Sequence, residues 1–317
     1  MSLDDKDDAR GQILFGLPTT SYHADQLGDD GPPSLSASMA KRICEETPEA
    51  ARLRHPRLRR PDDEPLDDEG TDASLRGNVL HRLVLGRGAD ILVISAEDKD
   101  GQLVTNYKTK AAQEQKREIL SMGCLPLLAR EREPYARAAV RIKTRLLEDW
   151  GIELNGESEV AVVWHEKAND GTPVRCRALF DHLWPSADAL DLKTCGWSVK
   201  PDACDNHIAS DDHDIQCAAY RSALAHLYPD ARSVRFRFAF AEAAAPNSVT
   251  VVEPDGVLLD LGERRWRYAI ETFARCMKTG VWPASYVPKG EVVRATARAW
   301  KLSAWEMKMQ SEQNQEE

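Results

Sequence analysis

Two charged residues of opposite sign lie two positions apart in segment 189–194, whose sequence is ALDLKT. In a β-strand, side chains alternate between the two faces, so Asp191 and Lys193 would share one face and the leucines the other. The carboxylate could bind a hard cation, and the lysine could orient a water nucleophile or stabilise developing negative charge. On its own the pair is more typical of a half-exposed strand, so its meaning depends on the surrounding residues.

Further candidate ligands precede this pair. Glu159 stands directly before the apolar run VAVVW, Asp181 lies in the next predicted strand, and His81 lies beside the apolar stripe of a predicted helix. Three carboxylates, an imidazole and a lysine suit one or two Mg²⁺ or Mn²⁺ ions, because these ions prefer carboxylate oxygen and Mn²⁺ tolerates imidazole. A metal pair about 4 Å apart would contact both the attacking water and the leaving oxygen of a phosphodiester. The set therefore predicts metal-dependent phosphodiester hydrolysis.

Several of these residues have a simpler interpretation. A histidine beside an apolar stripe is often a core residue, which is the alternative for His81. Gln216 and Tyr220 stand at i and i+4 of a predicted helix, where they either support the site or pack as ordinary neighbours. Glu157 also precedes the strand, and Glu159 is favoured as the ligand because it directly abuts the apolar run.

Periodicity and turn signals predict the elements that position these groups. Helices are predicted for residues 35–46, 50–53, 74–85, 109–122, 134–150, 214–227 and 261–278, and strands for residues 90–95, 159–164, 175–184, 189–194, 233–241 and 248–253. Residues 195–212 are predicted to be a long loop, because they are rich in Asp, Cys and Pro. Residues 1–33 contain much Gly, Asp and Pro with little apolar periodicity, which predicts a flexible segment.

The order of the motifs resembles the PD-(D/E)XK nuclease superfamily. The resemblance is greatest to its RecE-type branch, which includes the C-terminal nuclease of exodeoxyribonuclease VIII and its phage relatives. That branch carries an SxS…sP helix pair, GxxxH, a Glu heading a strand, RxRxD, DxKT and QxxxY. The matching residues are Ser36 and Ser38 with Pro48, Gly77 to His81, Glu159, Arg175 and Arg177 before Asp181, Asp191 to Thr194, Gln216 to Tyr220, and the tail segment 282–286.

The resemblance implies one α/β domain over residues 34–287. This PD-(D/E)XK (restriction-endonuclease-like) core would have a central mixed β-sheet flanked by helices and an N-terminal helical extension, followed by a partly helical tail at 288–317. The implied roles are metal binding by Asp181, Asp191, Glu159 and His81, positioning or activation of water by Lys193, and support of the site or DNA contact by Gln216, Tyr220, Arg175 and Arg177. It also implies a 5′-to-3′ exonuclease of double-stranded DNA ends in recombination or repair, of phage or prophage origin. A single-strand annealing protein would be a partner, and the chain would form a ring-shaped homo-oligomer.

Composition sets further bounds. The net charge of −10 argues against general nucleic-acid binding, but residues 103–147 carry ten basic against four acidic residues. The seven cysteines lack CxxC pairs, which favours reduced thiols, and their spacing does not fit an iron–sulfur cluster. No apolar run reaches membrane-spanning length and the N-terminus lacks a signal-peptide pattern, so we expect a cytoplasmic protein without a membrane partner.

Three other functions remain open from the sequence. The first is a nuclease of the same fold with another task, such as an endonuclease or a helicase-associated nuclease. The second is a non-catalytic DNA-binding protein on this scaffold, although the presence of all the acidic and basic site residues argues against it. The third is a structural protein whose carboxylates coincide by chance, which predicts no Mn²⁺ binding.

Overall fold

The computed structural model describes residues 10–64, 72–97, 101–287 and 289–316, and the chain separates into two units, 1–283 and 284–317. The strands of the first unit are β1 (Gln12–Leu14), β2 (Leu35–Ser36), β3 (Ile91–Ile94), β4 (Leu125–Leu128), β5 (Glu157–Lys167), β6 (Pro173–Trp184), β7 (Asp188–Cys195), β8 (Arg235–Glu242) and β9 (Val249–Val252). Its helices are α2 (Thr19–His23), α3 (Ala37–Glu45), α4 (Pro48–Arg54), α5 (Asp72–Leu85), α6 (Lys110–Ser121), the 3₁₀ turn η1 (Ala129–Glu131), α7 (Arg132–Trp150), α8 (Pro201–Ser210), α9 (His213–Leu227) and α10 (Gly256–Thr279).

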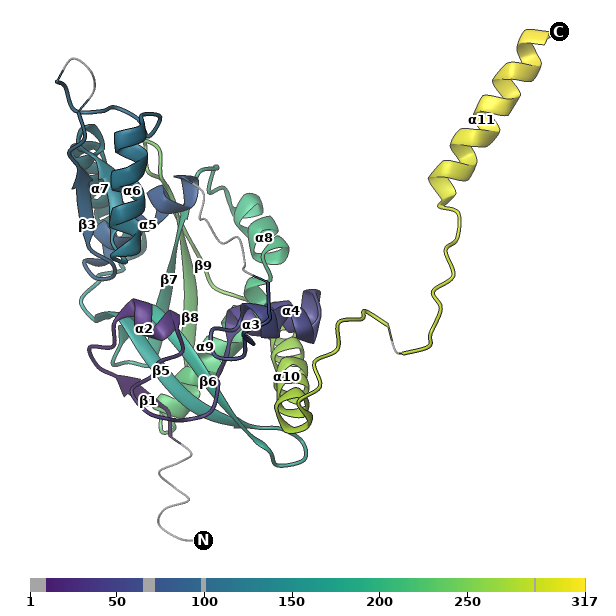
Figure 1. Cartoon of the computed structure of the whole chain (residues 1–317), viewed down its shortest axis with the longest axis horizontal. Helices are drawn as coiled ribbons and strands as arrows, with labels where there is room; N and C mark the ends of the chain where they lie inside the picture. Colours follow the sequence, from purple (N-terminus) through teal and green to yellow (C-terminus); the bar gives the residue numbers. More distant parts are fainter. Residues whose placement is uncertain (1–9, 65–71, 98–100, 288, 317) are drawn as a thin grey trace. The chain divides into compact units, whose positions relative to one another are not determined.

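A mixed sheet in the order β1-β5-β6-β7-β8-β9 forms the centre of this unit (Figure 1). Strands β5, β6 and β7 make an antiparallel meander, as their alternating patterns predicted. Strand β8 then pairs parallel to β7, because helices α8 and α9 carry the chain back to the same end of the sheet. The short strand β2 pairs with β6 on an edge that β7 leaves free.

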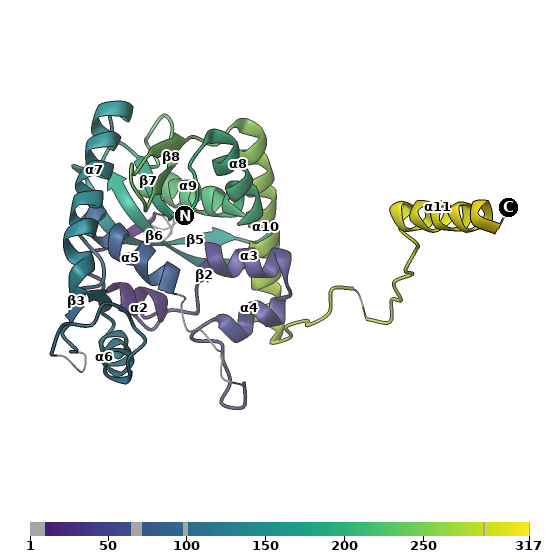
Figure 2. The same cartoon turned by 90° about the horizontal axis from the view of Figure 1, so that it is seen from above.

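Helices cover both faces of the sheet (Figure 2). Helices α5 and α7 lie on one side, where Leu80 and Ile142 pack against Leu190 and Leu192 of β7. Helices α3, α9 and α10 lie on the other side, around a larger core that includes Trp164 and Phe180. The prediction of a mixed α/β fold with a central mixed sheet flanked by helices is therefore confirmed.

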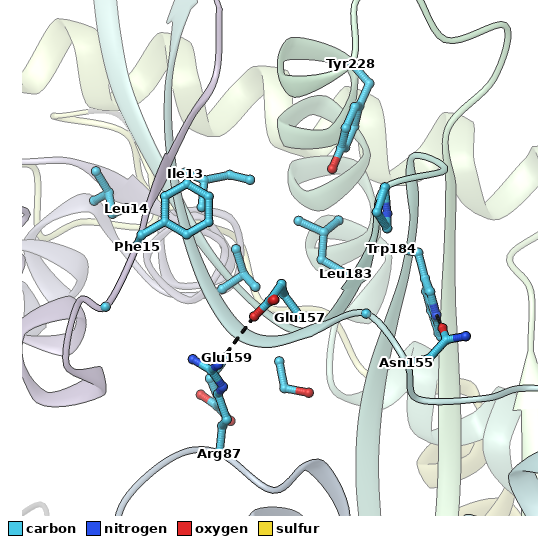
Figure 3. Close-up of a pocket in the computed structure, with 15 residues that line it drawn as sticks. Ile13, Leu14, Phe15, Arg87, Asn155, Glu157, Glu159, Leu183, Trp184 and Tyr228 are labelled. Atoms are coloured by element: carbon cyan, nitrogen blue, oxygen red, sulfur yellow. Dashed lines mark hydrogen bonds and ion pairs between the residues drawn. The ribbon is translucent and has the colours of Figure 1, made fainter.

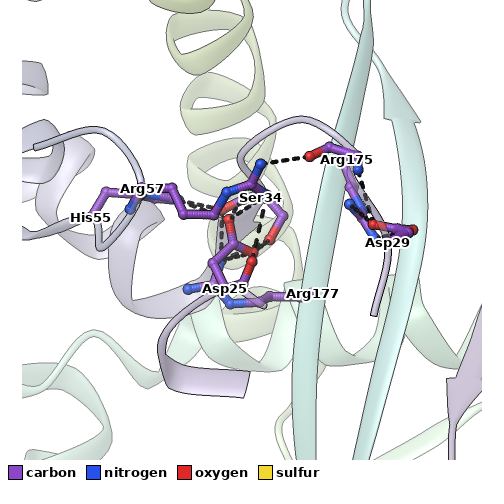
Figure 4. A network of polar contacts seen from close by, with 8 residues as sticks. Asp25, Asp29, Ser34, His55, Arg57, Arg175 and Arg177 are labelled. Atoms are coloured by element: carbon purple, nitrogen blue, oxygen red, sulfur yellow. Dashed lines mark hydrogen bonds and ion pairs between the residues drawn. The ribbon is translucent and has the colours of Figure 1, made fainter. Parts of the chain in front are cut away.

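The N-terminal segment differs from the flexible lead-in that its composition predicted. Residues 1–9 lie outside the described residues, but β1 pairs antiparallel with β5, and helix α2 follows. Asp25, just after α2, is buried and bonded to Ser34 and Arg177 (Figure 4). Low hydrophobicity misled the sequence interpretation, because this segment is held by polar partners that come from distant parts of the chain.

Two other elements differ from the predictions. Residues 195–212 were expected to be a loop, but they contain helix α8, which begins with Pro201 at a position where a missing N–H costs nothing. The strand predicted for 90–95 is present as β3. It pairs parallel with β4, which was not predicted, to form a separate two-stranded sheet.

The second unit contains helix α11 (Ala299–Glu316). Several large apolar side chains of this helix are exposed, among them Trp300, Trp305 and Met307. Across both units, none of the described helices combines the length and apolar content that a membrane span requires.

Candidate active site

The site lies where strands β6 and β7 part. Their ladder runs from the pair Trp184–Asp188 to the pair His182–Leu190 and then stops. One residue further on, the backbone N–H of Leu192 donates to the carboxylate of Asp181 at 2.7 Å. A side-chain oxygen thus takes the place of a backbone acceptor, and this opens the sheet and places polar groups between two central strands.

Three of the predicted ligands meet at this opening. Nε2 of His81 lies 2.9 Å from Oδ2 of Asp181, and its Nδ1 lies 3.5 Å from Oε1 of Glu159. One potential ligand atom from each of the three residues fits within a span of 4.8 Å. The structure therefore brings together residues from α5, β5 and β6 in a group with the size of a cation site.

Helix α5 brings His81 to this group by a close approach to the sheet. A Cβ atom added at Gly77 would lie 2.9 Å from Oγ1 of Thr194, at the end of β7. Because glycine has no side chain, α5 can pack directly against the strand that carries Asp191 and Lys193. Gly77, one turn before His81 on the same helix, thus sets how close His81 stands to the carboxylates.

The structure separates the two glutamates that precede β5. Glu159 has a φ of 54°, in the left-handed region that non-glycine residues rarely adopt, and its carboxylate points to His81. Glu157 is exposed and lies 3.5 Å from Arg87. The unusual backbone at Glu159 is typical of functional sites and favours Glu159 as the ligand.

Asp191, Lys193 and Gln216 form the second half of the site. Nζ of Lys193 lies 2.7 Å from Oδ2 of Asp191 and donates to Oε1 of Gln216 at 3.3 Å. The amide nitrogen of Gln216 donates to the other oxygen of Asp191. Oδ2 of Asp191 is buried, and Lys193 is its partner in an ion pair without the geometry of a hydrogen bond. Gln216 therefore positions both charged groups, and one carboxylate oxygen remains available.

Tyr220 has a different position. Its hydroxyl donates to the backbone carbonyl of Leu179 at 2.8 Å, and its ring packs edge-on against Phe180. Burial raises the pKa of this hydroxyl well above its usual value. Tyr220 supports the strand beside the site and does not reach the carboxylates.

Arg175 and Arg177 are buried, and each pairs with a carboxylate of the N-terminal segment. Arg175 lies 2.7 Å from Asp29, and Arg177 lies 2.7 Å from Asp25 and donates to Ser34. Both arginine side chains are at most 5% exposed. Between supporting the site and contacting DNA, this burial favours support.

The carboxylates crowd one another. Burial and the neighbouring Asp181 raise the pKa of Glu159 to about 7. Burial alone would lower the pKa of His81, but Asp181 and Glu159 outweigh it and raise this pKa to about 9. Burial also raises the pKa of Asp191, against the attraction of Lys193. Burial therefore disfavours the ionised form of these carboxylates, and a bound cation would stabilise it.

The donor set fits a hard cation. Carboxylate oxygens come from Glu159, Asp181 and Asp191, and one imidazole comes from His81, which matches Mg²⁺ or, with nitrogen ligation, Mn²⁺. Oδ2 of Asp191 has the ion pair with Lys193 at 2.7 Å as its only interaction among the described residues, so it keeps lone pairs that a cation can use.

A cleft of about 630 Å³ opens over these residues. Its rim contains arginines that the sequence analysis did not select, namely Arg54, Arg82 and Arg87. They come from α4, from α5 and from the segment after α5, and no local pattern links them. By contrast, Arg141 and Arg145 of the predicted basic region bond to Asn247 and Pro246, beside β9.

A second, smaller cavity of about 260 Å³ adjoins the cleft, since Glu159 and Arg87 line both (Figure 3). Phe15 enters it from the segment after β1, and Trp184 and Tyr228 face it from the other side. Phe15 is 83% exposed, which is unusual for a phenylalanine. The site therefore has a charged cleft and an aromatic pocket on two sides of Glu159.

Comparison with known proteins gives a likeness in structure only. No family model matches the chain, and no curated protein matches it. Among solved structures, the crystal structure of a "putative exonuclease" from Eubacterium rectale is similar, with a TM-score of 0.53 and 13% sequence identity over 92% of this chain and 99% of that one. The two chains share a fold.

Proposed function

We propose that the chain is a metal-dependent deoxyribonuclease with a PD-(D/E)XK core of the RecE type. The observation that carries this proposal is the group of three carboxylates, His81 and Lys193 at the point where β6 and β7 part. The order of the sequence motifs and the shared fold of the "putative exonuclease" support it. Acting on double-stranded DNA ends from 5′ to 3′, in recombination or repair, is the finer part of the proposal and rests on the RecE-type motifs.

Glu159, Asp181, Asp191 and His81 would hold one or two Mg²⁺ or Mn²⁺ ions. Bound there, the ion would lower the pKa of a coordinated water and offset charge on the scissile phosphate. Lys193 is fixed between Asp191 and Gln216, so its ammonium can align the water and stabilise the developing negative charge. Gln216 acts through these two residues and is a positioning residue.

The substrate class follows from the charges around the cleft. Arg54, Arg82 and Arg87 line the cleft that contains the carboxylates, and they suit the phosphates of a nucleic-acid backbone. The net charge of −10 is compatible with this, because binding depends on local patches. A single-strand annealing protein as partner and a ring-shaped oligomer remain proposals that follow from the RecE-type motifs.

A gel assay with end-labelled linear duplex and a closed circle of the same sequence tests this function. We expect Mg²⁺ to support degradation of the linear DNA, EDTA to stop it, and the circle to survive. Lys193→Ala should lower the rate by about 100- to 1,000-fold, the usual loss when a charge-stabilising donor is removed. Lys200→Ala, an exposed lysine at the start of α8, is the matched control and should keep the parent rate.

The same assay separates the alternatives. Cleavage of the circle would favour an endonuclease of the same fold. Binding of duplex without cleavage in either Mg²⁺ or Mn²⁺ would favour a non-catalytic DNA-binding protein. If Lys193→Ala and the parent degrade DNA equally fast, the proposed role of the lysine is wrong.

A further inference from the structure

A second group of possible metal ligands lies at the junction of helices α8 and α9. One ligand atom each from His207, Asp211 and His213 fits within a span of 4.8 Å, and Nε2 of His207 lies 3.3 Å from Oδ2 of Asp211. None of these residues belongs to the His81 group. The cluster thus lies beside Lys193 and Gln216 of the site described above, and the proposed nuclease chemistry does not use its three residues.

The local backbone explains why the three side chains converge. His207 and Asp211 stand at i and i+4, so they share a face at the end of α8. Asp212 has a φ of 53°, and this left-handed residue turns the chain sharply into α9. The turn brings His213, the first residue of α9, back beside His207, with ring centroids 5.3 Å apart.

His213 provides the observation that points to a ligand. His213 is only 6% exposed. Its Nε2 atom is buried and has no hydrogen-bond partner among the described residues. Leaving such an atom without a partner costs about 1–3 kcal/mol. The rings of Phe238 and Trp197 pack against the two histidines, which explains their burial but gives Nε2 no partner.

The other nitrogen of the His213 ring is already held. Nζ of Lys41 lies 3.2 Å from Nδ1, and the same Nζ donates to the backbone carbonyl of Asp211 at 2.7 Å. Histidines that bind metal commonly have a hydrogen-bond partner on the second ring nitrogen, and here Lys41 takes the place of the usual carboxylate, carbonyl or water. A cation can bind Nε2 only after that nitrogen has lost its proton, so binding would release one proton to solvent, with Nδ1–H then donating to Lys41 as a neutral amine.

We propose that His207, Asp211 and His213 form a second cation site, which takes a transition metal such as Zn²⁺ or Co²⁺ and not Mg²⁺. Two imidazoles and one carboxylate are a frequent donor set for Zn²⁺, whereas Mg²⁺ prefers an all-oxygen shell. A cation there joins the end of α8 to the start of α9. It would also fix the helix that carries Gln216, three residues beyond His213.

Titration of the metal-free full-length chain with Co²⁺ and Zn²⁺ tests the site, by visible absorption for Co²⁺ and by calorimetry for Zn²⁺. We expect a tetrahedral Co²⁺ spectrum that persists in Asp181→Asn. The Zn²⁺ affinity should fall by more than 10-fold in His207→Ala and in Asp211→Asn. These two residues are partly or fully exposed, so the folded state should tolerate both changes. His165→Ala, outside both clusters, is the matched control.

Two results would overturn the proposal. One is a Co²⁺ spectrum and a Zn²⁺ affinity that His207→Ala and Asp211→Asn leave unchanged. The other is a spectrum that disappears in Asp181→Asn, which would place the only transition-metal site in the carboxylate cleft. Neither readout depends on nuclease activity, so failure of this site and failure of the proposed function can be told apart.

Discussion

Strand β6 carries two buried charged groups four residues apart, and their surroundings differ. Arg177 meets Asp25 at 2.7 Å, and Asp25 also accepts from the N–H and the hydroxyl of Ser34 (Figure 4). Asp181 instead stands with two other carboxylates, Glu159 and Asp191, and His81, Lys193 and Arg82 offset this group. In the first region arginines surround a single carboxylate, and in the second three carboxylates lie close together.

This difference separates a structural network from a candidate active site. The Asp25 network ties the N-terminal segment to the sheet and has no need of a ligand. Burial and the neighbouring carboxylates raise the pKa of Glu159 and of Asp191, so a bound cation would stabilise the ionised form of both. Buried charge alone does not indicate function, whereas several carboxylates that gather in an open cleft do.

Removing a carboxylate should affect activity and not folding. We expect Asp181→Asn to lower the nuclease rate by about 1,000-fold, because the metal supplies several kcal/mol of charge stabilisation. The amide oxygen can still accept from the N–H of Leu192, so the free energy of unfolding without metal should change by less than about 1 kcal/mol. Rate measurements and urea unfolding on the same preparation check both parts. If the variant unfolded at a much lower urea concentration than the parent chain, Asp181 would be needed for folding as well as for activity.

The Asp25 network should show the opposite behaviour. Arg177→Met leaves the buried Asp25 with only the longer arginine contact, to Arg57 at 3.6 Å, which should cost about 3–5 kcal/mol of unfolding free energy. Asp25→Asn in the same chain should restore much of this loss. Arg264→Met breaks an exposed pair with Asp260 and serves as the control, with an expected change of at most about 1 kcal/mol. A stable Arg177→Met variant would show that the network is not structural.

Binding of Mn²⁺ at the carboxylate group should stabilise the folded chain. Mn²⁺ at a hundred times its dissociation constant should raise the free energy of unfolding by about 2.7 kcal/mol. The gain should disappear in Asp181→Asn and should persist in a chain that carries Asp25→Asn. Thermal unfolding with and without Mn²⁺ measures it. Equal gains in both variants would mean that the ion binds elsewhere.

Two histidines beside Asp181, His182 and His81, should respond differently to acid pH. Burial lowers the pKa of His182 to about 4, whereas the carboxylates raise that of His81 to about 9. A lowered histidine pKa contributes stability that is complete above the unfolded value of about 6.5 and is lost as the pH falls towards 4. At about pH 5 the loss from His182 should be at most about 2 kcal/mol. Denaturant unfolding at about pH 7.5 and 5 should show a shallower loss in His182→Gln than in the parent chain.

The sequence predicted the parts of this fold that depend on local pattern. Strands β5 to β7 lie where alternation placed them, and the RecE-type motif order selected Asp181, Asp191 and Lys193, which the structure brings to one opening in the sheet. Strand alternation alone placed Asp191 beside Lys193 correctly, because neighbours two apart share a face.

The remainder depended on contacts between distant residues. No residue near Asp25 in the sequence indicates that Arg177 is its partner, so the N-terminal segment was predicted to be flexible. The run from 195 to 212 read as a loop because its Pro and Asp residues are also turn signals, although Pro201 begins a helix here. The cleft arginines Arg54, Arg82 and Arg87 come from separate segments and show no spacing pattern.

The close packing of Gly77 on Thr194 gives the chain an unusual kind of genetic sensitivity. A side chain at position 77 must displace either the Thr194 hydroxyl or α5 itself, and His81 moves wherever the helix gives way. Inheritable changes in catalytic rate can therefore arise at a residue that carries no functional group. A graded series from alanine to valine at this position would vary the distance between the imidazole and the carboxylates in small steps, with every ligand retained.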